Sequence, residues 1–315
     1  MALDEATTQL LSQMAEGGAK PLHEMTVEEA RALAGSLNEA YGPGPEMHKI
    51  EQGRILVSGG AVPIRLLVPN DRPRGVIVYY HGGGWVIGAI DDFDALGRHL
   101  AARTGCVVAL VDYRLAPEYR FPTAVDDAWA ALRWVDQHRE DLAGARVPLI
   151  VAGDSAGGNL AAVMAQRAKA ADGPPIALQV LVYPVTDCDF TTTSYLNAEN
   201  QLLLTRDAMI WFWDHYAPDE LVRIHFDASP LRNPELSFLP PAVILTAEHD
   251  VLRDEGEVYA TVLLKAGVPV QHRRFEGQMH GFFPMVNLLP GSATGIDYVV
   301  DRIEESLAGL EAVTP

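Results

Sequence analysis

Short apolar runs alternate with longer stretches of helical periodicity along most of the chain. Several runs consist almost entirely of Val, Ile, Leu, Ala and Tyr, which is typical of strands covered on both faces. The apolar runs predict strands at 54–58, 63–68, 76–80, 107–111, 149–152, 177–183, 242–246 and 270–275, and the periodic stretches predict helices at 92–103, 124–138, 156–170, 253–266 and 295–310. This alternation predicts an α/β fold with a mostly parallel central sheet and helices on both faces.

Two segments do not follow this alternation. Residues 1–50 have a helical pattern with a capping box at Thr26–Glu29, and they end at the breaker sequence 42–45. Residues 186–235 form a long excursion between two predicted strands, and inserts of this length are usually lids or binding elements. We therefore expect an α/β domain made of residues 51–185 and 236–315.

The balance of charged residues disfavours several kinds of partner. The 315 residues include 24 Lys and Arg against 42 Asp and Glu, which gives a formal net charge of −18. Nucleic-acid binding needs clustered basic residues, and anionic membranes repel an acidic surface. The first residues lack the features of a secretory signal, and no apolar run reaches the roughly 18 residues of a membrane span. We expect a soluble, cytoplasmic protein with no nucleic-acid and no membrane partner.

Neither of the two cysteines is a candidate for catalysis. Cys106 lies in an apolar run and is expected to be a small buried residue. Cys188 lies between Asp187 and Asp189, whose charges are expected to raise the pKa of its thiol and make it a poor nucleophile.

A G-x-S-x-G sequence occupies residues 153–157, directly after a predicted strand and directly before a predicted helix. A strand-to-helix turn this tight forces its serine into strained backbone angles, and the flanking glycines let neighbouring backbone pass closely. The turn projects the Ser155 hydroxyl above the carboxyl end of the sheet, at a helix N-terminus that favours negative charge. The alternative is a glycine-rich helix start with a capping serine. The strand–turn–helix context favours Ser155 as a nucleophile.

Three consecutive glycines follow the predicted strand 76–80, in the sequence HGGGW at 81–85. Bare backbone N–H groups in such a loop converge on a small anion, and HGGG is the pattern of oxyanion-hole loops in lipases and esterases. The predicted donors are the N–H groups of Gly83, Gly84 and Ala156. A phosphate-binding loop is the competing interpretation, but the G-K-[ST] sequence that it requires is missing. His81 is interpreted as an anchor of the loop.

A serine nucleophile needs a base, and the chain has ten histidines. In hydrolases whose serine lies in a G-x-S-x-G turn between a strand and a helix, the acid and then the histidine follow the serine along the chain. His280 is the predicted base because it lies just past the carboxyl end of the strand 270–275, where parallel sheets place their sites. The acid is expected after the preceding strand. Asp250 is preferred there and Glu248 is the main alternative, whereas Asp254 is interpreted as a first-turn residue of the next helix.

Five motifs, in this order, resemble those of the hormone-sensitive-lipase-like bacterial carboxylesterases, which have the α/β-hydrolase fold. They are HGGGW at 81–85, DYRLAPE at 112–118, GDSAGGN at 153–159, HDVLRDEG at 249–256 and HGFF at 280–283. The resemblance implies a catalytic triad of Ser155, Asp250 and His280. It also implies that residues 1–50 and the insert 186–235 form a helical cap. Val251 is a departure, because the family often has proline there.

Aromatic residues beside the motifs are the predicted lining of the substrate pocket. The candidates are Trp85, Tyr183, Trp213 and Phe282. Trp213 shares a helical stripe with Met209 and Tyr216, for which packing of the cap onto the main domain is an equally good interpretation. Asp154 and Asn159 are expected to hold the nucleophile turn through backbone hydrogen bonds.

The resulting hypothesis is a serine carboxylesterase that hydrolyses short-chain acyl or aryl esters of small molecules. The preference for short chains, and a possible homodimer through the last strand and helix, are implications of the resemblance. A serine amidase or formamidase on the same scaffold is the alternative, and a non-catalytic binding protein with this fold is a further one. No H-E-x-x-H and no paired C-x-x-C motif is present, so neither a metal nor a cofactor is predicted.

Overall fold

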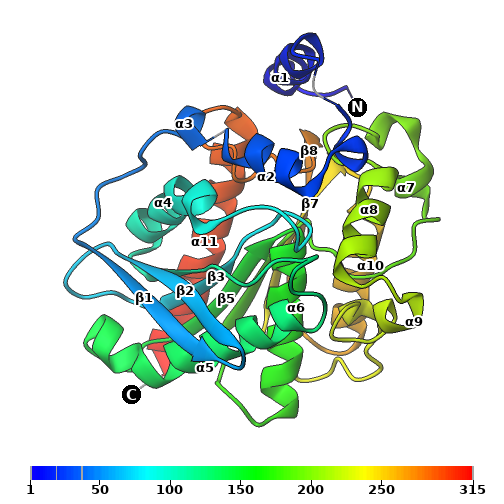
Figure 1. Cartoon of the computed structure of the whole chain (residues 1–315). Helices are drawn as coiled ribbons and strands as arrows, with labels where there is room; N and C mark the ends of the chain where they lie inside the picture. The colour runs from blue at the N-terminus through cyan, green and yellow to red at the C-terminus, as the bar shows by residue number, and fades with distance from the viewer. Residues whose placement is uncertain (1, 19, 37, 314–315) are drawn as a thin grey trace.

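The computed structural model describes residues 2–18, 20–36 and 38–313; residues 1, 19, 37, 314 and 315, which belong to the first and last predicted segments, lie outside the described residues. One eight-stranded sheet runs through the molecule in the order β1-β2-β4-β3-β5-β6-β7-β8 (Figure 1). β2 pairs antiparallel with β1 and β4, and all further pairs are parallel. The strands are β1 Lys49–Val57, β2 Gly60–Val68, β3 Val76–Tyr80, β4 Val107–Val111, β5 Leu149–Asp154, β6 Leu178–Val182, β7 Ala242–His249 and β8 Val270–Met279. The predicted α/β fold with a mostly parallel sheet is confirmed.

The central strands are apolar because helices cover both of their faces. Every residue of β3, β4 and β5 is buried, and β3 and β4 have the predicted bounds. The edge strands β1 and β8 are longer than predicted. In β8 the four residues 271–274 are exposed, so polar positions hide the apolar pattern along that strand.

Five long helices form the outer layers, and each face of the sheet has its own hydrophobic core. One face carries α4 Asp94–Thr104 and α11 Pro290–Val313, and the other carries α5 Thr123–Ala143, α6 Ala156–Ala170 and α10 Arg253–Lys265. All five were predicted, although α5 and α11 extend further than their apolar periodicity indicates.

Shorter helices make up the two segments that interrupt the alternation. α1 Glu5–Glu16, η1 Leu22–Glu24, α2 Val27–Gly35 and α3 Asn38–Tyr41 precede β1, and η2 Ile90–Phe93 leads into α4. The β6–β7 connection holds α7 Thr193–Leu196, η3 Ala198–Asn200, α8 Arg206–Tyr216, α9 Glu220–Arg223 and η4 Pro230–Arg232. The N-terminal segment and the insert meet where η1 packs against α8. That these segments act as a cap stays a prediction.

The predicted capping box begins α2. The Thr26 hydroxyl oxygen accepts from the Glu29 N–H at 3.2 Å, and the Glu29 carboxylate accepts from the Thr26 N–H at 2.8 Å. Both bonds satisfy backbone N–H groups that the start of the helix leaves unpaired.

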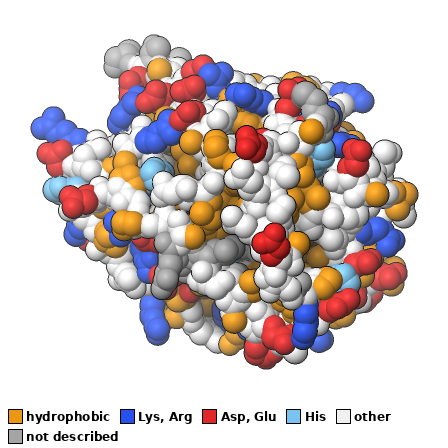
Figure 2. Space-filling view, turned by 90° about the horizontal axis from the view of Figure 1, so that it is seen from above, with side chains coloured by type: hydrophobic (Ala, Val, Ile, Leu, Met, Phe, Trp, Pro, Cys, Tyr) orange, Lys and Arg blue, Asp and Glu red, His pale blue; other side chains and the backbone are white. Residues whose placement is uncertain are grey.

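The surface over these short helices has a simple charge pattern. Apolar side chains gather near the middle of the face seen from above, and charged side chains lie mainly toward its rim (Figure 2). Among residues 2–18, 20–36 and 38–313, no helix has both the length and the apolar character needed to span a bilayer.

Both cysteines are free thiols with raised pKa values. Burial raises the pKa of the Cys106 thiol to about 11. Burial is also the largest cause of the raised pKa of Cys188, ahead of the neighbouring Asp187. The explanation from neighbouring charges therefore needs correction, although the direction of the shift was predicted.

Candidate active site

Ser155 occupies the tight turn between β5 and α6, with backbone angles φ 55° and ψ −119°. Such strain persists only where the surrounding structure holds it. The Ser155 N–H donates to the Val182 carbonyl at 2.9 Å, and the Ser155 carbonyl accepts from the Val185 N–H at 3.2 Å. A Cβ at Gly157 would overlap the Tyr80 carbonyl oxygen, so this position requires glycine. The turn has the geometry of a nucleophile elbow.

Two hydrogen bonds connect Ser155, His280 and Asp250 in a line. His280 Nε2 lies 3.0 Å from Ser155 Oγ, and His280 Nδ1 lies 2.8 Å from Asp250 Oδ2. Because an ionised carboxylate only accepts, Nδ1 carries the proton and Nε2 is left to accept from the serine hydroxyl. The Leu252 N–H donates to the other carboxylate oxygen at 2.9 Å and fixes its orientation. The three side chains are aligned for proton transfer from Ser155.

An irregularity in the last strand pair places the histidine. The pairing of β7 with β8 shifts register between Ala247 and His249, and Gly277 has a φ of 69°. A bulge of this kind redirects the chain near a strand end. His280 therefore follows β8 directly and stands at the carboxyl edge of the sheet.

The other carboxylates of this region have different partners. Glu248, the alternative acid, accepts from the Gly277 N–H at 2.7 Å. Asp254 accepts from the Ser194 N–H at 2.7 Å in the first turn of α10. Asp250 is the carboxylate that is hydrogen-bonded to His280.

The glycine loop, defined as residues 81–88, faces Ser155 across a shared cavity. Gly83 and Gly84 have φ values of 110° and 57°, which other residues rarely adopt. Among the described residues, the N–H groups of these two glycines have no protein acceptor. The N–H of Ala156 opens helix α6, where helical bonding leaves it unpaired. All three predicted donors are thus available to a negatively charged oxygen beside Ser155.

Asp154 connects the nucleophile elbow to the glycine loop. Its Oδ1 accepts from the Gly82 N–H at 3.0 Å and from the Tyr79 hydroxyl at 2.8 Å. The carboxylate also interacts with the backbone of Asp154 itself, so it supports its own turn, as expected, and in addition the facing loop. Burial raises the pKa of this carboxyl from 3.8 to about 6, against the lowering effect of the two hydrogen bonds.

The raised pKa makes Asp154 a destabilising group at neutral pH. An unfolded Asp titrates near 3.9, so the folded chain binds this proton more tightly than the unfolded chain does. The stability that the neutral carboxyl contributes is complete below about pH 4 and is lost as the pH rises through about 6, at a cost of about 3 kcal/mol. We expect Asp154→Asn, which stays neutral, to raise the free energy of unfolding by about 3 kcal/mol at pH 8 and by less than about 1 kcal/mol near pH 4.

Urea unfolding at the two pH values measures this difference. Asp127→Asn is the matched control, because Asp127 is equally buried but forms an ion pair with Arg114 at 2.7 Å. The control is expected to destabilise the protein. Equal stabilisation by Asp154→Asn at pH 4 and pH 8 would contradict the prediction.

A cavity of about 180 Å³ with mainly apolar walls opens beside Ser155. Its walls include Leu22, Ala34 and Tyr41 from the N-terminal segment, Leu204, Met209 and Phe212 from the insert, and Pro284 and Met285 from the loop after His280. Of these eight residues, the sequence pattern indicates Met209, through the helical stripe that it shares with Trp213. Pro284 and Met285 directly follow the HGFF motif, which is a signal that could have found them. The others come together only through the tertiary fold.

The four aromatic residues predicted to bind substrate lie behind the cavity wall. Trp85, Tyr183, Trp213 and Phe282 are each at most 1% exposed, and none of them lines the cavity. Tyr183 packs on the His280 ring with centroids 4.5 Å apart, and Phe282 meets Tyr183 edge-on at 5.7 Å. The structure therefore gives these two rings a packing role around the histidine.

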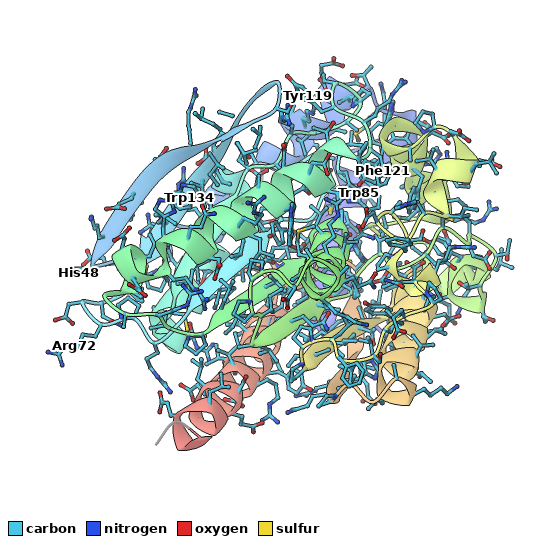
Figure 3. The ribbon with its side chains drawn as sticks, turned by 90° about the horizontal axis from the view of Figure 1, so that it is seen from below. His48, Arg72, Trp85, Tyr119, Phe121 and Trp134 are labelled. Atoms are coloured by element: carbon cyan, nitrogen blue, oxygen red, sulfur yellow. The ribbon has the colours of Figure 1, made fainter. Side chains whose placement is uncertain are left out.

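Trp85 and Trp213 belong to an aromatic cluster that joins the insert to the main domain. The Trp85 ring stacks on Tyr216 at 4.1 Å and meets Trp213 edge-on at 5.0 Å. Phe121, labelled near Trp85 in Figure 3, meets Tyr216 edge-on at 5.7 Å. In the predicted stripe of Met209, Trp213 and Tyr216, Met209 lines the cavity, whereas Trp213 and Tyr216 pack against Trp85 of the main domain. The pocket-lining interpretation therefore holds for Met209, and the packing interpretation holds for the other two.

Further motif residues hold the scaffold. His81 is buried, its Nδ1 lies 2.7 Å from the next carbonyl, and its ring stacks on Tyr113 at 4.3 Å. Burial lowers the pKa of His81, which fits an anchor of the loop. Asn159 donates to the Val185 and Ala228 carbonyls at 2.9 and 2.8 Å. This side chain thus connects the helix after the elbow to the insert.

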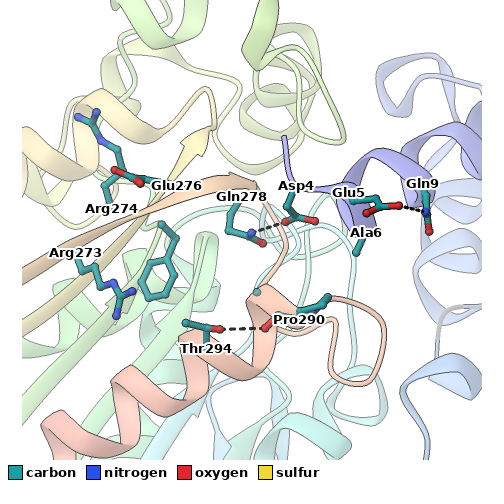
Figure 4. A pocket seen from close by; sticks show the side chains of 12 residues that line it. Asp4, Glu5, Ala6, Gln9, Arg273, Arg274, Glu276, Gln278, Pro290 and Thr294 are labelled. Atoms are coloured by element: carbon teal, nitrogen blue, oxygen red, sulfur yellow. Dashed lines mark hydrogen bonds between the residues drawn. The ribbon is translucent and has the colours of Figure 1, made fainter. Parts of the chain in front are cut away.

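A larger groove of about 930 Å³ lies among α1, β8 and α11 (Figure 4). Charged residues of both signs line it, and many already have partners: Gln278 donates to Asp4, and the Arg273 guanidinium stacks 4.7 Å above Phe275. None of Ser155, His280 and Asp250 borders it. Nowhere in the described part of the chain do three His, Cys, Asp or Glu residues gather in a way that could hold a metal ion.

Comparisons with known proteins identify the family of the chain. The family described as alpha/beta hydrolase fold matches residues 77–284. The chain is 40% identical over 275 residues to carboxylesterase NlhH of Mycobacterium tuberculosis, covering 85% of each protein. It is 36% identical over 298 residues to the ethyl acetate hydrolase of Pseudomonas putida, covering 92% of this chain and 94% of that protein.

Solved structures of esterases are similar to this chain over nearly its whole length. A Pyrobaculum calidifontis esterase matches with a TM-score of 0.88 and 36% identity, covering 96% of this chain and 98% of that chain. A thermostable esterase from Pseudomonas putida ECU1011 matches with a TM-score of 0.89 and 35% identity, covering 97% of this chain and 98% of that chain.

Proposed function

Because the chain belongs to the alpha/beta hydrolase fold family, among the hormone-sensitive-lipase-like carboxylesterases, and is a carboxylic ester hydrolase, we propose that it cleaves short-chain acyl esters through Ser155, His280 and Asp250. The observation that carries this proposal is the line of hydrogen bonds from Asp250 through His280 to Ser155, at the base of a small apolar cavity.

The proposed reaction begins with proton transfer. His280 Nε2 takes the proton of Ser155 as Oγ attacks the ester carbonyl, and Asp250 stabilises the imidazolium that forms. The carbonyl oxygen becomes an oxyanion, which the N–H groups of Gly83, Gly84 and Ala156 bind. His280 then protonates the leaving alcohol. Water removes the acyl group from Ser155 by the same sequence of steps.

The test of this proposal compares matched substrates. We expect rapid hydrolysis of p-nitrophenyl butyrate and far slower hydrolysis of butyryl p-nitroanilide, whose leaving group is an amine. Faster cleavage of the anilide would favour the amidase alternative and contradict the proposal.

The proposed preference for short acyl chains depends on Phe212. Its ring is 3% exposed, it lines the cavity, and a Cβ placed on Gly84 would overlap it. A substrate carbonyl oxygen bound at Gly84 brings the acyl chain toward this ring. We therefore propose that Phe212 limits the length of the acyl chain.

We expect wild-type kcat/KM to be at least about tenfold higher for the butyrate ester than for the hexadecanoate ester. Phe212→Ala opens the wall and is expected to raise kcat/KM for the octanoate ester, relative to the butyrate ester, by about tenfold. Trp211→Ala is the matched control, because Trp211 lies beside Phe212 on α8 but does not line the cavity. Similar rates for butyrate and hexadecanoate, or an equal change in the control, would contradict this role.

A further inference from the structure

The glycine loop has a conformation that needs external support. Gly83, Gly84 and Trp85 are three consecutive residues at positive φ, and Trp85, at 59°, is not a glycine. The Val86 and Ile87 N–H groups donate to the Gly83 carbonyl at 3.0 and 2.9 Å and close the turn from within. Strain of this kind lasts only where neighbouring groups over-determine it. The residues that hold this turn from outside therefore matter for the proposed oxyanion donors.

One outside support comes from the DYRLAPE motif. The Ala116 N–H donates to the Trp85 carbonyl at 2.8 Å. This bond ties the glycine loop to residues 115–118, which lie beside it in the fold. It leaves the next carbonyl, that of Val86, to another donor.

That donor is Arg31 of helix α2. Its Nε donates to the Val86 carbonyl at 2.9 Å, and its Nη2 donates to the Ala116 carbonyl at 3.0 Å. The same guanidinium forms a bidentate ion pair with the Glu118 carboxylate, with both N–O distances at 2.8 Å. A guanidinium donates in several fixed directions at once, which a lysine ammonium cannot reproduce. One side chain from the N-terminal segment thus fastens the glycine loop to the DYRLAPE motif.

The charge of the pair is consistent with a persistent contact. The hydrogen bonds from Arg31 hold the pKa of Glu118 down to about 2, so Glu118 is ionised at neutral pH. The helix that carries Arg31 also contributes Ala34 to the cavity wall. Helix α2 therefore contributes both to the cavity wall and to the support of the loop.

We infer that Arg31 is a positioning residue for ester hydrolysis: it couples docking of the N-terminal segment to the geometry of the Gly83–Gly84 oxyanion donors. This inference rests on the proposed function. Arg31 is not among the residues that line the cavity, and its bonds to the main domain's backbone go to the Val86 and Ala116 carbonyls, so it acts through these two groups. Its loss should weaken binding of the transition state more than binding of the substrate.

The test uses the full chain and three variants. We expect Arg31→Ala to lower kcat for p-nitrophenyl butyrate by about 10- to 100-fold with KM changed less than about threefold, because small displacements of oriented groups cost this much. The affinity for a butyl trifluoromethyl ketone, which forms an oxyanion with the serine, should fall by the same factor as kcat. Arg31→Lys keeps the charge opposite Glu118 but not the bonds to both carbonyls, and it should lose most of the activity that Arg31→Ala loses. Glu118→Gln leaves both carbonyl bonds in place and should lose much less.

Arg274→Ala is the matched control, because Arg274 makes a similar bidentate pair with Glu257 far from the glycine loop. It should leave kcat and ketone affinity unchanged. A folded Arg31→Lys or Arg31→Ala with wild-type kcat and ketone affinity would overturn the inference, and so would a loss confined to KM. If Arg31→Ala does not fold, Arg31→Lys and Glu118→Gln decide the matter. Failure of the proposed function has a different signature, since the ketone would then not inhibit even the wild type.

Discussion

Replacing Ser155 with alanine is expected to lower kcat for p-nitrophenyl butyrate by about 10⁶-fold. In the proposed mechanism the hydroxyl is the attacking group that forms the acyl intermediate, and it lies 3.0 Å from His280 Nε2. The side chain is small and its backbone strain is held by neighbouring hydrogen bonds, so the variant is expected to fold. Stopped-time assays over several hours, with circular dichroism as the check on folding, measure the loss.

Ser229→Ala is the matched control for this variant. Ser229 is a buried serine in the insert whose hydroxyl donates to the Arg223 carbonyl at 2.7 Å. Its loss should leave kcat within a few-fold of the wild type. A folded Ser155→Ala that keeps more than about one thousandth of the wild-type rate would remove Ser155 from the mechanism.

Replacing Asp250 with asparagine is expected to lower kcat by about 10⁴-fold while KM changes little. Asn is nearly the same size and fits the fully buried position, but its amide group favours the other histidine tautomer. His280 Nε2 then carries the proton and cannot accept from Ser155. Steady-state kinetics at several pH values measure the loss.

Glu248→Gln separates the two carboxylates that the sequence offers as the acid. Glu248 accepts from the Gly277 N–H and makes no bond to His280 among the described contacts. We expect its variant to keep kcat within a few-fold of the wild type. The opposite order of losses, with Glu248→Gln the more severe, would overturn the assignment of Asp250.

The chain's family, fold and enzyme class could be predicted from the sequence because the motifs that indicate them each form one local piece of structure. G-x-S-x-G and HGGG are short, because a single tight turn or loop performs each task, and both follow strands whose apolar runs are obvious. Asp250 and His280 could be chosen because the carboxyl ends of parallel strands meet at one edge of the sheet. The predicted roles of these residues remain proposals, although the structure brings the three side chains together.

The cavity wall could not be predicted in the same way. Nearness in sequence to a motif does not say which way a side chain points: Trp85 follows the glycines, yet its positive φ turns it into the aromatic cluster with Tyr216. Leu22, Ala34 and Tyr41 reach the cavity from a segment with no strand pattern. Their positions depend on contacts such as that of Arg31 with Val86, which are distant in sequence and leave no local signal.

Covalent labelling of the intact protein with diethyl p-nitrophenyl phosphate tests whether Ser155 is the nucleophile. A serine aligned with a histidine base displaces p-nitrophenolate and keeps the phosphoryl group. We expect one label per chain, located by peptide mass spectrometry on Ser155, with esterase activity lost in proportion and no labelling of Ser155→Ala. A fully labelled chain that keeps its activity, or a label on another residue, would contradict this role of Ser155.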